Sequence, residues 1–298
     1  MEDKKILEKY DSALEQYTNE VLPGFWHTLQ NRRRPFQPFL EKLFKFYLFC
    51  SYLADCNLFA NKEEKYPSLQ ILYVKASLAL FGIRNCLQYG LVTEGAILLR
   101  SLFEAYLNVK LILQKDTEER LKLFYDFRHV EQWNNLLANK KLLKNGKLTQ
   151  DAFDKKFTSA HTKDIEENYL LVKSNYNQKQ PYHWAWKIFN DEIKGNPSVR
   201  FIASKLDLSL DYVQVYTSLS IAVHNSPNLL NLVSTGNIIT LNPNFSDSIY
   251  HDGCLALLYL SELIEDIAQY LELAEANEIS TYLSALTLSA HDEYQGNS

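Results

Sequence analysis

The sequence predicts an all-α protein, a multi-helix bundle of long helices. Apolar residues recur at intervals of three and four along most of the 298 residues, which is the period of an amphipathic helix. Glycines number only nine and prolines eight, fewer than the turns of a barrel or sandwich of this length require. Because 46% of the residues are hydrophobic, the chain can bury a sizeable core, as one large helical domain or two closely packed ones.

Long helices are expected to occupy the first half of the chain. The apolar spacing places five of them at 3–30, 36–60, 66–90, 93–115 and 117–143. Pro35 marks the start of the second helix, and Gly90 closes the third. Thr93 and Thr117 stand where the N-caps of the last two are expected, and acids follow Thr117 in the first turn, where the helix dipole favours them.

The middle of the chain, 144–200, is less regular, and we interpret it as an insertion over the bundle with one helix near 162–177. A short helix starts at Pro197, and the next helix starts at Ser209 or Leu210.

The last part of the chain combines two helices with the only strands that the sequence predicts. Residues 229–241 suit a small β-hairpin, because β-branched runs flank Thr-Gly-Asn. A long helix follows at 247–275 and a shorter one at 277–290. We therefore describe 1–298 as a single helical domain whose three parts are the N-terminal helices 1–143, the insertion 144–200 and the acidic C-terminal helices 201–298.

Charge is distributed unevenly along the chain. No Lys or Arg follows Lys205, so residues 206–298 hold twelve acids and no base, a charge of −12. The first 205 residues hold 31 bases and 24 acids, a charge of +7, and the two parts add to the net −5. This asymmetry indicates either a polar partner for one half or two parts that pack together and neutralise each other. A basic face for nucleic acid would have to lie in the first two thirds.

The sequence indicates a soluble, cytoplasmic protein that does not bind a membrane. Its first residues mix acids and bases and lack the apolar core of a secretory signal. No stretch reaches the roughly 18 uncharged apolar residues that a membrane span needs. The cysteines have neither paired spacing nor a nearby histidine cluster, so we interpret them as reduced packing residues, and no metal or cofactor is expected.

Two separate segments carry the candidate catalytic residues. Tyr212, Tyr216, Ser220 and His224 recur every four residues, so a helix places them along one flank. Arg100 and Glu104 lie one turn apart in apolar surroundings, and we expect both charges to face the interior.

These groups suggest a specific chemistry if the two segments meet. An Arg paired with a Glu keeps donors free for a phosphate, an imidazole titrates near neutral pH, and tyrosine hydroxyls orient a nucleophile. The hypothesis is metal-independent phosphodiester cleavage, with catalytic roles for Arg100, Glu104, Tyr216, Ser220 and His224. The alternative is a hydrogen-bond network between helices that only fixes their packing.

Of the substrate-binding candidates, all but Tyr212 lie on other segments. Arg128, beside Tyr125 on the fifth helix, can reach an anion or the acidic C-terminal part. Trp184 and Trp186 can stack on a base, cover the site as a lid, or pack the irregular segment. Tyr212 completes this group.

At these residues the chain resembles an uncharacterised family of bacterial helical proteins, a domain of unknown function. The resemblance covers about 66–245 and rests on Leu-Arg-Ser-Leu-Phe-Glu at 99–104, on the tryptophans ahead of Ser-Val-Arg-Phe-Ile-Ala at 198–203, and on the Tyr-x3-Tyr-x3-Ser-x3-His stripe. It implies an all-α fold and a shared polar site with no reaction attached. A more distant similarity is to the HEPN group of helical ribonucleases and toxins, whose signature places an Arg, followed by a polar residue, four to six positions before a His. This sequence lacks that signature, so the corresponding pair would have to be split across helices as Arg100 and His224.

Two functional hypotheses follow, and they leave open whether the protein is an enzyme. The first is a metal-independent ribonuclease or toxin-like defence protein acting on RNA or another phosphate-bearing ligand. The second is a non-catalytic interaction or scaffold module of a bacterial defence or toxin–antitoxin system, with a protein partner or a second copy of the chain as its ligand.

Overall fold

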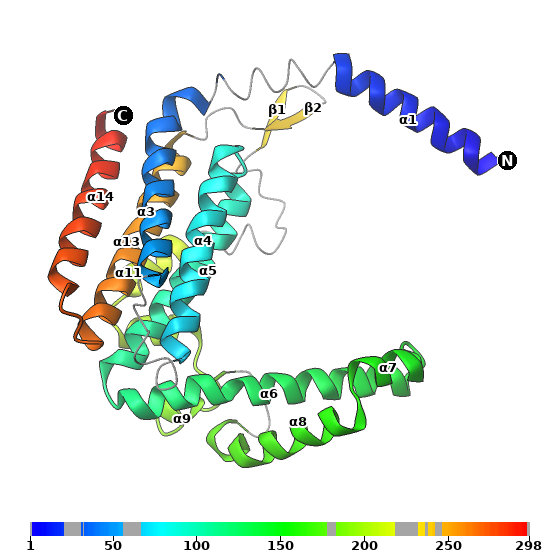
Figure 1. The fold of residues 1–298 in the computed structure, drawn as a ribbon, viewed down its shortest axis with the longest axis vertical. Coiled ribbons are helices and arrows are strands. Elements are labelled where there is room, and N and C mark those ends of the chain that lie inside the picture. The colour runs from blue at the N-terminus through cyan, green and yellow to red at the C-terminus, as the bar shows by residue number, and fades with distance from the viewer. Residues whose placement is uncertain are drawn as a thin grey trace.

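The computed structural model describes residues 2–20, 31, 33–55, 67–177, 183–217, 232–235, 238–241 and 246–296. Helices dominate these residues, which confirms the all-α prediction (Figure 1). In the described part of the chain no helix is both long and apolar enough to cross a membrane. The elements follow in the order α1 (Glu2–Glu20), the 3-10 helix η1 (Arg34–Phe36), α3 (Gln37–Asp55), α4 (Pro67–Gln88), α5 (Val92–Gln114), α6 (Thr117–Lys144), α7 (Gln150–Lys156), α8 (Ser159–Val172), the 3-10 helix η2 (Lys173–Asn175), α9 (Trp186–Phe189), α10 (Val199–Lys205), α11 (Ser209–Asp211), the π-helix η3 (Tyr212–Thr217), β1 (Leu232–Thr235), β2 (Ile238–Leu241), α13 (Ser246–Tyr270) and α14 (Ala276–Gly296).

The core of the molecule is a bundle of α3, α4, α5, α13 and α14. Helix α5 packs against α4 and α13, while α14 packs against α13 and α3 (Figure 1). The apolar spacing read from the sequence faces this core, since Phe39, Leu43, Phe46 and Cys50 are all buried on α3. Cys50, Cys86 and Cys254 are free thiols, as expected of packing residues, and Cys56 lies outside the described residues.

A glycine sets the distance between α3 and α13. A Cβ atom added at Gly253 on α13 would lie 2.5 Å from Cε1 of Phe39 on α3. The Phe39 ring is fully buried and packs edge-on against Tyr250, with the ring centroids 4.8 Å apart. The two helices therefore approach closely only because position 253 has no side chain.

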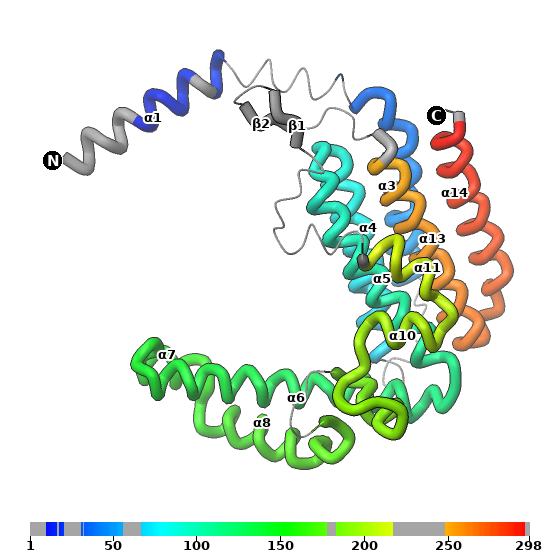
Figure 2. The backbone as a smooth tube through the Cα atoms, turned by 180° about the vertical axis from the view of Figure 1, so that it is seen from behind, coloured from blue at the N-terminus to red at the C-terminus, as the bar shows by residue number. Residues whose placement is uncertain are grey.

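Helices α6, α7 and α8 form an arm that projects sideways from one end of the bundle (Figures 1 and 2). The segment 144–200 is therefore more regular than expected, because it contains α7, α8 and α9. Thr149 and Thr158 cap α7 and α8 by accepting backbone N–H bonds through their hydroxyls. The arm has a small apolar cluster of its own, formed by Leu136, Phe153, Phe157 and Ile165.

The predicted N-caps of α5 and α6, Thr93 and Thr117, were wrong. Helix α5 begins at Val92 after Leu91, so Thr93 lies inside it, and the N-cap of α6 is Asp116 rather than Thr117. Neither cap residue accepts a bond through its side chain. Instead Arg120, buried in the first turn of α6, donates to the carbonyl of Leu111 at the end of α5. A buried guanidinium thus closes a junction at which threonine caps were expected.

The two strands lie in the segment for which a hairpin is expected. β1 and β2 pair antiparallel, with Leu232 opposite Leu241 and Thr235 opposite Ile238. The connecting residues 236 and 237 lie outside the described part of the chain.

Candidate functional site

Helix α5 positions the Arg–Glu pair one turn apart. Arg100 Nε lies 3.4 Å from Glu104 Oε1. The Arg100 side chain is 18% exposed and that of Glu104 43% exposed. The expectation that both charges face the interior is therefore right for Arg100 and wrong for Glu104, because Glu104 lies where α5 emerges at a cavity described below.

Two tyrosines from η3 complete the cluster around Arg100. The Nη2 of Arg100 donates a hydrogen bond to the Tyr216 hydroxyl, and its guanidinium carbon lies 3.8 Å from the centre of the Tyr216 ring. Tyr212 stacks on Tyr216 with the ring centroids 5.1 Å apart and the planes 19° apart. Residues more than one hundred positions apart in the chain thus meet at Arg100. Ser220 and His224 lie outside the described residues.

The local structure of the tyrosine segment differs from a regular α-helix. Residues Tyr212–Thr217 form a π-helix, which has one more residue per turn. Such turns are rare and occur frequently at functional sites. The sequence spacing of four correctly paired the two rings, while the wider turn that carries them was not foreseen.

The electrostatics of the cluster favour a protonated phenol beside a cation. Burial raises the pKa of Tyr216, and the Glu104 carboxylate raises it further, against the lowering effect of Arg100. Tyr216 is therefore a hydrogen-bond donor at neutral pH. The Nη1 of Arg100 is buried and makes no hydrogen bond to any residue that the structure describes. A buried donor in this state favours binding of an acceptor.

A cavity of about 790 Å³ adjoins this cluster between α4, α5 and α6. Glu104 belongs to both the Arg100 cluster and the cavity, because it pairs with Arg100 and also lines the cavity wall. Most of the wall is apolar. Its polar and charged members are Lys75, Ser101, Glu104, Asn108, Tyr125, Arg128 and Glu131, with Trp184 closing one side.

Arg128 and Lys75 are the cations of this cavity. The guanidinium carbon of Arg128 lies 3.4 Å from the centre of the Tyr125 ring, and burial lowers the pKa of Arg128. Neither cation makes an ion pair with a described residue. Glu104 and Glu131 also line the cavity, so its formal charges balance, and the group suited to an anionic ligand is the unpaired guanidinium of Arg128.

The two tryptophans proposed for base stacking differ in position. The indole N–H of Trp184 donates to Asn108 Oδ1 at 2.8 Å, and its ring meets Phe124 edge-on at 5.4 Å. Because Trp184 is only 5% exposed, it serves as a wall of the cavity and offers no open face to a base. Trp186 begins α9 and is absent from the residues that line this cavity.

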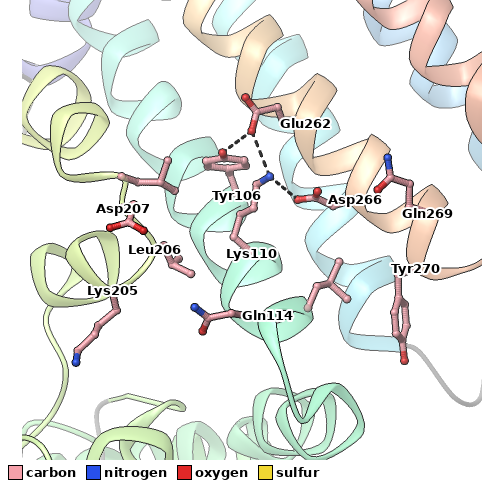
Figure 3. A pocket seen from close by; sticks show the side chains of 12 residues that line it. Tyr106, Lys110, Gln114, Lys205, Leu206, Asp207, Glu262, Asp266, Gln269 and Tyr270 are labelled. Atoms are coloured by element: carbon pink, nitrogen blue, oxygen red, sulfur yellow. Dashed lines mark hydrogen bonds and ion pairs between the residues drawn. The ribbon is translucent and has the colours of Figure 1, made fainter.

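A second polar cavity was missed by the sequence reading. It has a volume of about 640 Å³ and contains Tyr106 and Lys110 from α5 with Glu262 and Asp266 from α13 (Figure 3). No residue of α13 is among the site residues predicted from the sequence. A signal was present, since Tyr106–Lys110 and Glu262–Asp266 each have a spacing of four, but spacing alone does not tell which helices face each other.

The described residues contain no group of three or more His, Cys, Asp or Glu side chains arranged to hold a metal ion.

Comparison with known proteins gives a family and no activity. No curated protein and no solved structure matches the chain. A family model described as a family of unknown function, DUF5677, matches residues 69–238. This range holds the Arg100 cluster and the charged residues of the larger cavity. The chain therefore belongs to this uncharacterised family, DUF5677.

Proposed function

We propose that the protein is a metal-independent ribonuclease that acts at the Arg100 cluster, with a HEPN-like toxin or defence role. The observation that carries the proposal is the guanidinium of Arg100, which Glu104 and Tyr216 hold in place while one of its buried nitrogens has no partner among the described residues. A fixed, incompletely bonded guanidinium is suited to a phosphodiester oxygen.

The proposed reaction uses the 2′-hydroxyl of the RNA as the nucleophile. His224 removes its proton, the 2′-oxygen bonds to the adjacent phosphorus, and the bond from phosphorus to the 5′-oxygen breaks. The leaving 5′-oxygen takes up a proton from water and His224 returns its proton to solvent, so the products are a 2′,3′-cyclic phosphate and a 5′-hydroxyl end. Arg100 and the phenol of Tyr216 stabilise the charge that develops on the phosphoryl oxygens, and Ser220 orients the nucleophile.

The adjoining cavity supports the choice of a phosphate-bearing substrate. Its volume of about 790 Å³ lies within the range of about 300–1,000 Å³ typical of ligand pockets. In this proposal Lys75 and Arg128 bind the phosphate of a flanking nucleotide, and Glu104 links that subsite to the cleavage site. The base contacts apolar walls and Tyr125, while Trp184 keeps the wall rigid through its bond to Asn108.

The test compares cleavage of a labelled single-stranded RNA in chelator by the wild type, Arg100→Ala and His224→Ala. Arg200→Ala is the matched control, since Arg200 is an exposed residue of α10 that does not line the cavity. We expect each site variant to lose about 10²–10³-fold in rate and the control to lose none. The matching DNA strand should resist, because it lacks the 2′-hydroxyl.

Two results would reject the proposal. Either no cleavage by the wild type, or equal cleavage by all four proteins, removes the Arg100 cluster as a ribonuclease site. Circular dichroism melting of each variant separates loss of chemistry from loss of fold.

A surface feature favours the second candidate function, a non-catalytic interaction module. Ile71, Val74 and Leu78 are exposed at spacings of three and four on one face of α4. Such a face suits a protein partner or a second copy of the chain. Light scattering after size exclusion would detect a homodimer. Ile71 and Leu78 also line the proposed substrate cavity, whereas Val74 does not. If a homodimer forms, Val74→Asp should therefore convert it to a monomer and leave RNA cleavage unchanged.

A further inference from the structure

The second cavity lies on the opposite side of α5 from the first and shares no lining residue with it. Its walls are α5, the turn between α10 and α11, and α13 (Figure 3). The Arg100 site plays no part in it.

A network of four side chains forms its centre. Lys110 Nζ lies 3.3 Å from Glu262 Oε2 and 2.9 Å from Asp266 Oδ2. The Tyr106 hydroxyl donates to Glu262 Oε2 at 2.6 Å. Each carboxylate thus uses one oxygen, and among the described residues the other oxygens, Glu262 Oε1 and Asp266 Oδ1, have no hydrogen-bond partner.

The charges around the cavity do not cancel. One cation, Lys110, faces two carboxylates. Lys205 on the opposite wall is already paired with Glu192, and Asp207 beside it has no ion pair with a described residue. Two bases against the acids Glu192, Asp207, Glu262 and Asp266 leave +2 − 4 = −2. Three of these acids belong to the base-free stretch 206–298.

The uncompensated charges lie on two different walls. Glu262 and Asp266 lie on α13, and Asp207 lies across the cavity beside Leu206 (Figure 3). Between them lie Leu206 and Leu208, both half-buried, while Tyr106 is only 2% exposed. A ligand that complements this arrangement carries positive charge at two ends and an apolar chain between them.

We infer that this cavity binds an aliphatic diamine or polyamine, with one ammonium group at Glu262 and Asp266 and the other at Asp207. The methylene chain crosses Leu206 and Leu208, and no covalent step is involved. The protonation state of Lys110 is consistent with this binding mode. Burial lowers the pKa of Lys110, but its ion pairs with Asp266 and Glu262 outweigh burial and raise it. Lys110 therefore stays charged and holds the carboxylates in place.

The experiment is isothermal titration of RNA-free protein with spermidine and with putrescine. Asp266→Asn removes one of the α13 charges, and Asp207→Asn removes the charge on the opposite wall. Asp207 has a φ of 59°, a left-handed conformation that asparagine also adopts, so this variant should fold normally. Glu166→Gln, on the exposed side of α8, makes the same change in net charge elsewhere.

We expect saturable binding at one site, weakened about tenfold in each aspartate variant and unchanged in Glu166→Gln. Three results would overturn the inference. These are no heat of binding in the wild type, equal affinity in all four proteins, and full displacement of spermidine by an equal concentration of Mg²⁺, which would indicate a site for any cation. The titration contains no RNA, so its result is independent of the ribonuclease test.

Discussion

The contact at Gly253 gives a prediction whose magnitude follows from the structure. In Gly253→Ala the new methyl would lie 2.5 Å from Cε1 and 2.6 Å from Cζ of Phe39. Carbon atoms in contact normally lie about 3.5–4.0 Å apart, so the helices or the ring must move by about 1 Å. The Phe39 ring has no free space, because it is fully buried against Tyr250. Overpacking of this kind costs about 1–3 kcal/mol.

The higher helix propensity of alanine offsets part of this overpacking cost. Alanine is a better helix former than glycine by about 1 kcal/mol. We therefore expect Gly253→Ala to lower the free energy of unfolding by up to about 2 kcal/mol, with a fall in Tm of about 2 °C per kcal/mol.

Gly82→Ala in α4 is the matched control. Its methyl would lie 2.7 Å from one Cδ1 atom of Leu98, and the next atom is at 3.8 Å. The end of a half-buried leucine can change rotamer for about 0.5–1.5 kcal/mol, which nearly cancels the gain in helix propensity. Urea unfolding of the three proteins should show loss in Gly253→Ala and little change in Gly82→Ala. Without a steric clash, alanine would make the protein more stable by about 1 kcal/mol, so a Gly253→Ala variant more stable than the wild type would contradict the close packing of α3 on α13.

Three further predictions concern other buried groups. Burial lowers the pKa of His183 from 6.5 to about 4, so the unfolded chain binds the proton first and stability is lost as the pH falls from 6.5 towards 4. Relative to His183→Asn, the wild type should lose up to about 2 kcal/mol by pH 5 in urea titrations, and parallel pH profiles would contradict this. Arg120→Met leaves the Leu111 carbonyl without its donor and should cost about 1–3 kcal/mol in denaturant unfolding, whereas an unchanged midpoint would mean that Arg120 does not cap α5. Ser68→Ala removes a 2.8 Å bond to the Leu121 carbonyl and should lower stability by about 1 kcal/mol in the same assay; no loss would show that water replaces it.

The helices of the bundle were predictable because burial requires a simple repeat. Residues on α3 and α5 that recur at three and four are the ones that lie in the core, so spacing alone located these helices to within a few residues. Helix starts were less predictable. A threonine cap is a local signal, but the α5–α6 junction is closed by Arg120, whose contact depends on how two helices meet.

In the candidate site, too, contacts within one segment were predictable from spacing, whereas contacts between helices were not. The pairing of Arg100 with Glu104 and of Tyr212 with Tyr216 follows from spacing along one segment. That Arg100 meets Tyr216 was an inference from chemistry, since buried polar groups need partners. The network at Lys110 could not be inferred in this way, because its side chains are of common types that more often lie in solvent.

The short helix α7 of the arm was not predicted from the sequence. Helix α7 is only seven residues long and lies in a stretch without a clear apolar repeat, so the sequence predicted irregular structure there. Its stability depends on the Thr149 cap and on contact between Phe153 and Phe157. Short helices of this kind become evident only when their packing partners are known.

The wide turn at Tyr212–Thr217 allows the chain length of this segment to differ by one residue. Deleting one residue there, such as Val213, would allow an ordinary α-helical turn, because a π-turn is an α-helical turn with one inserted residue. The segments on either side would then keep their orientation, and Tyr216 would stay at Arg100 although the chain had become one residue shorter. Relatives that lack one residue at this point are accordingly expected to keep the Arg–Tyr contact where both residue types are retained.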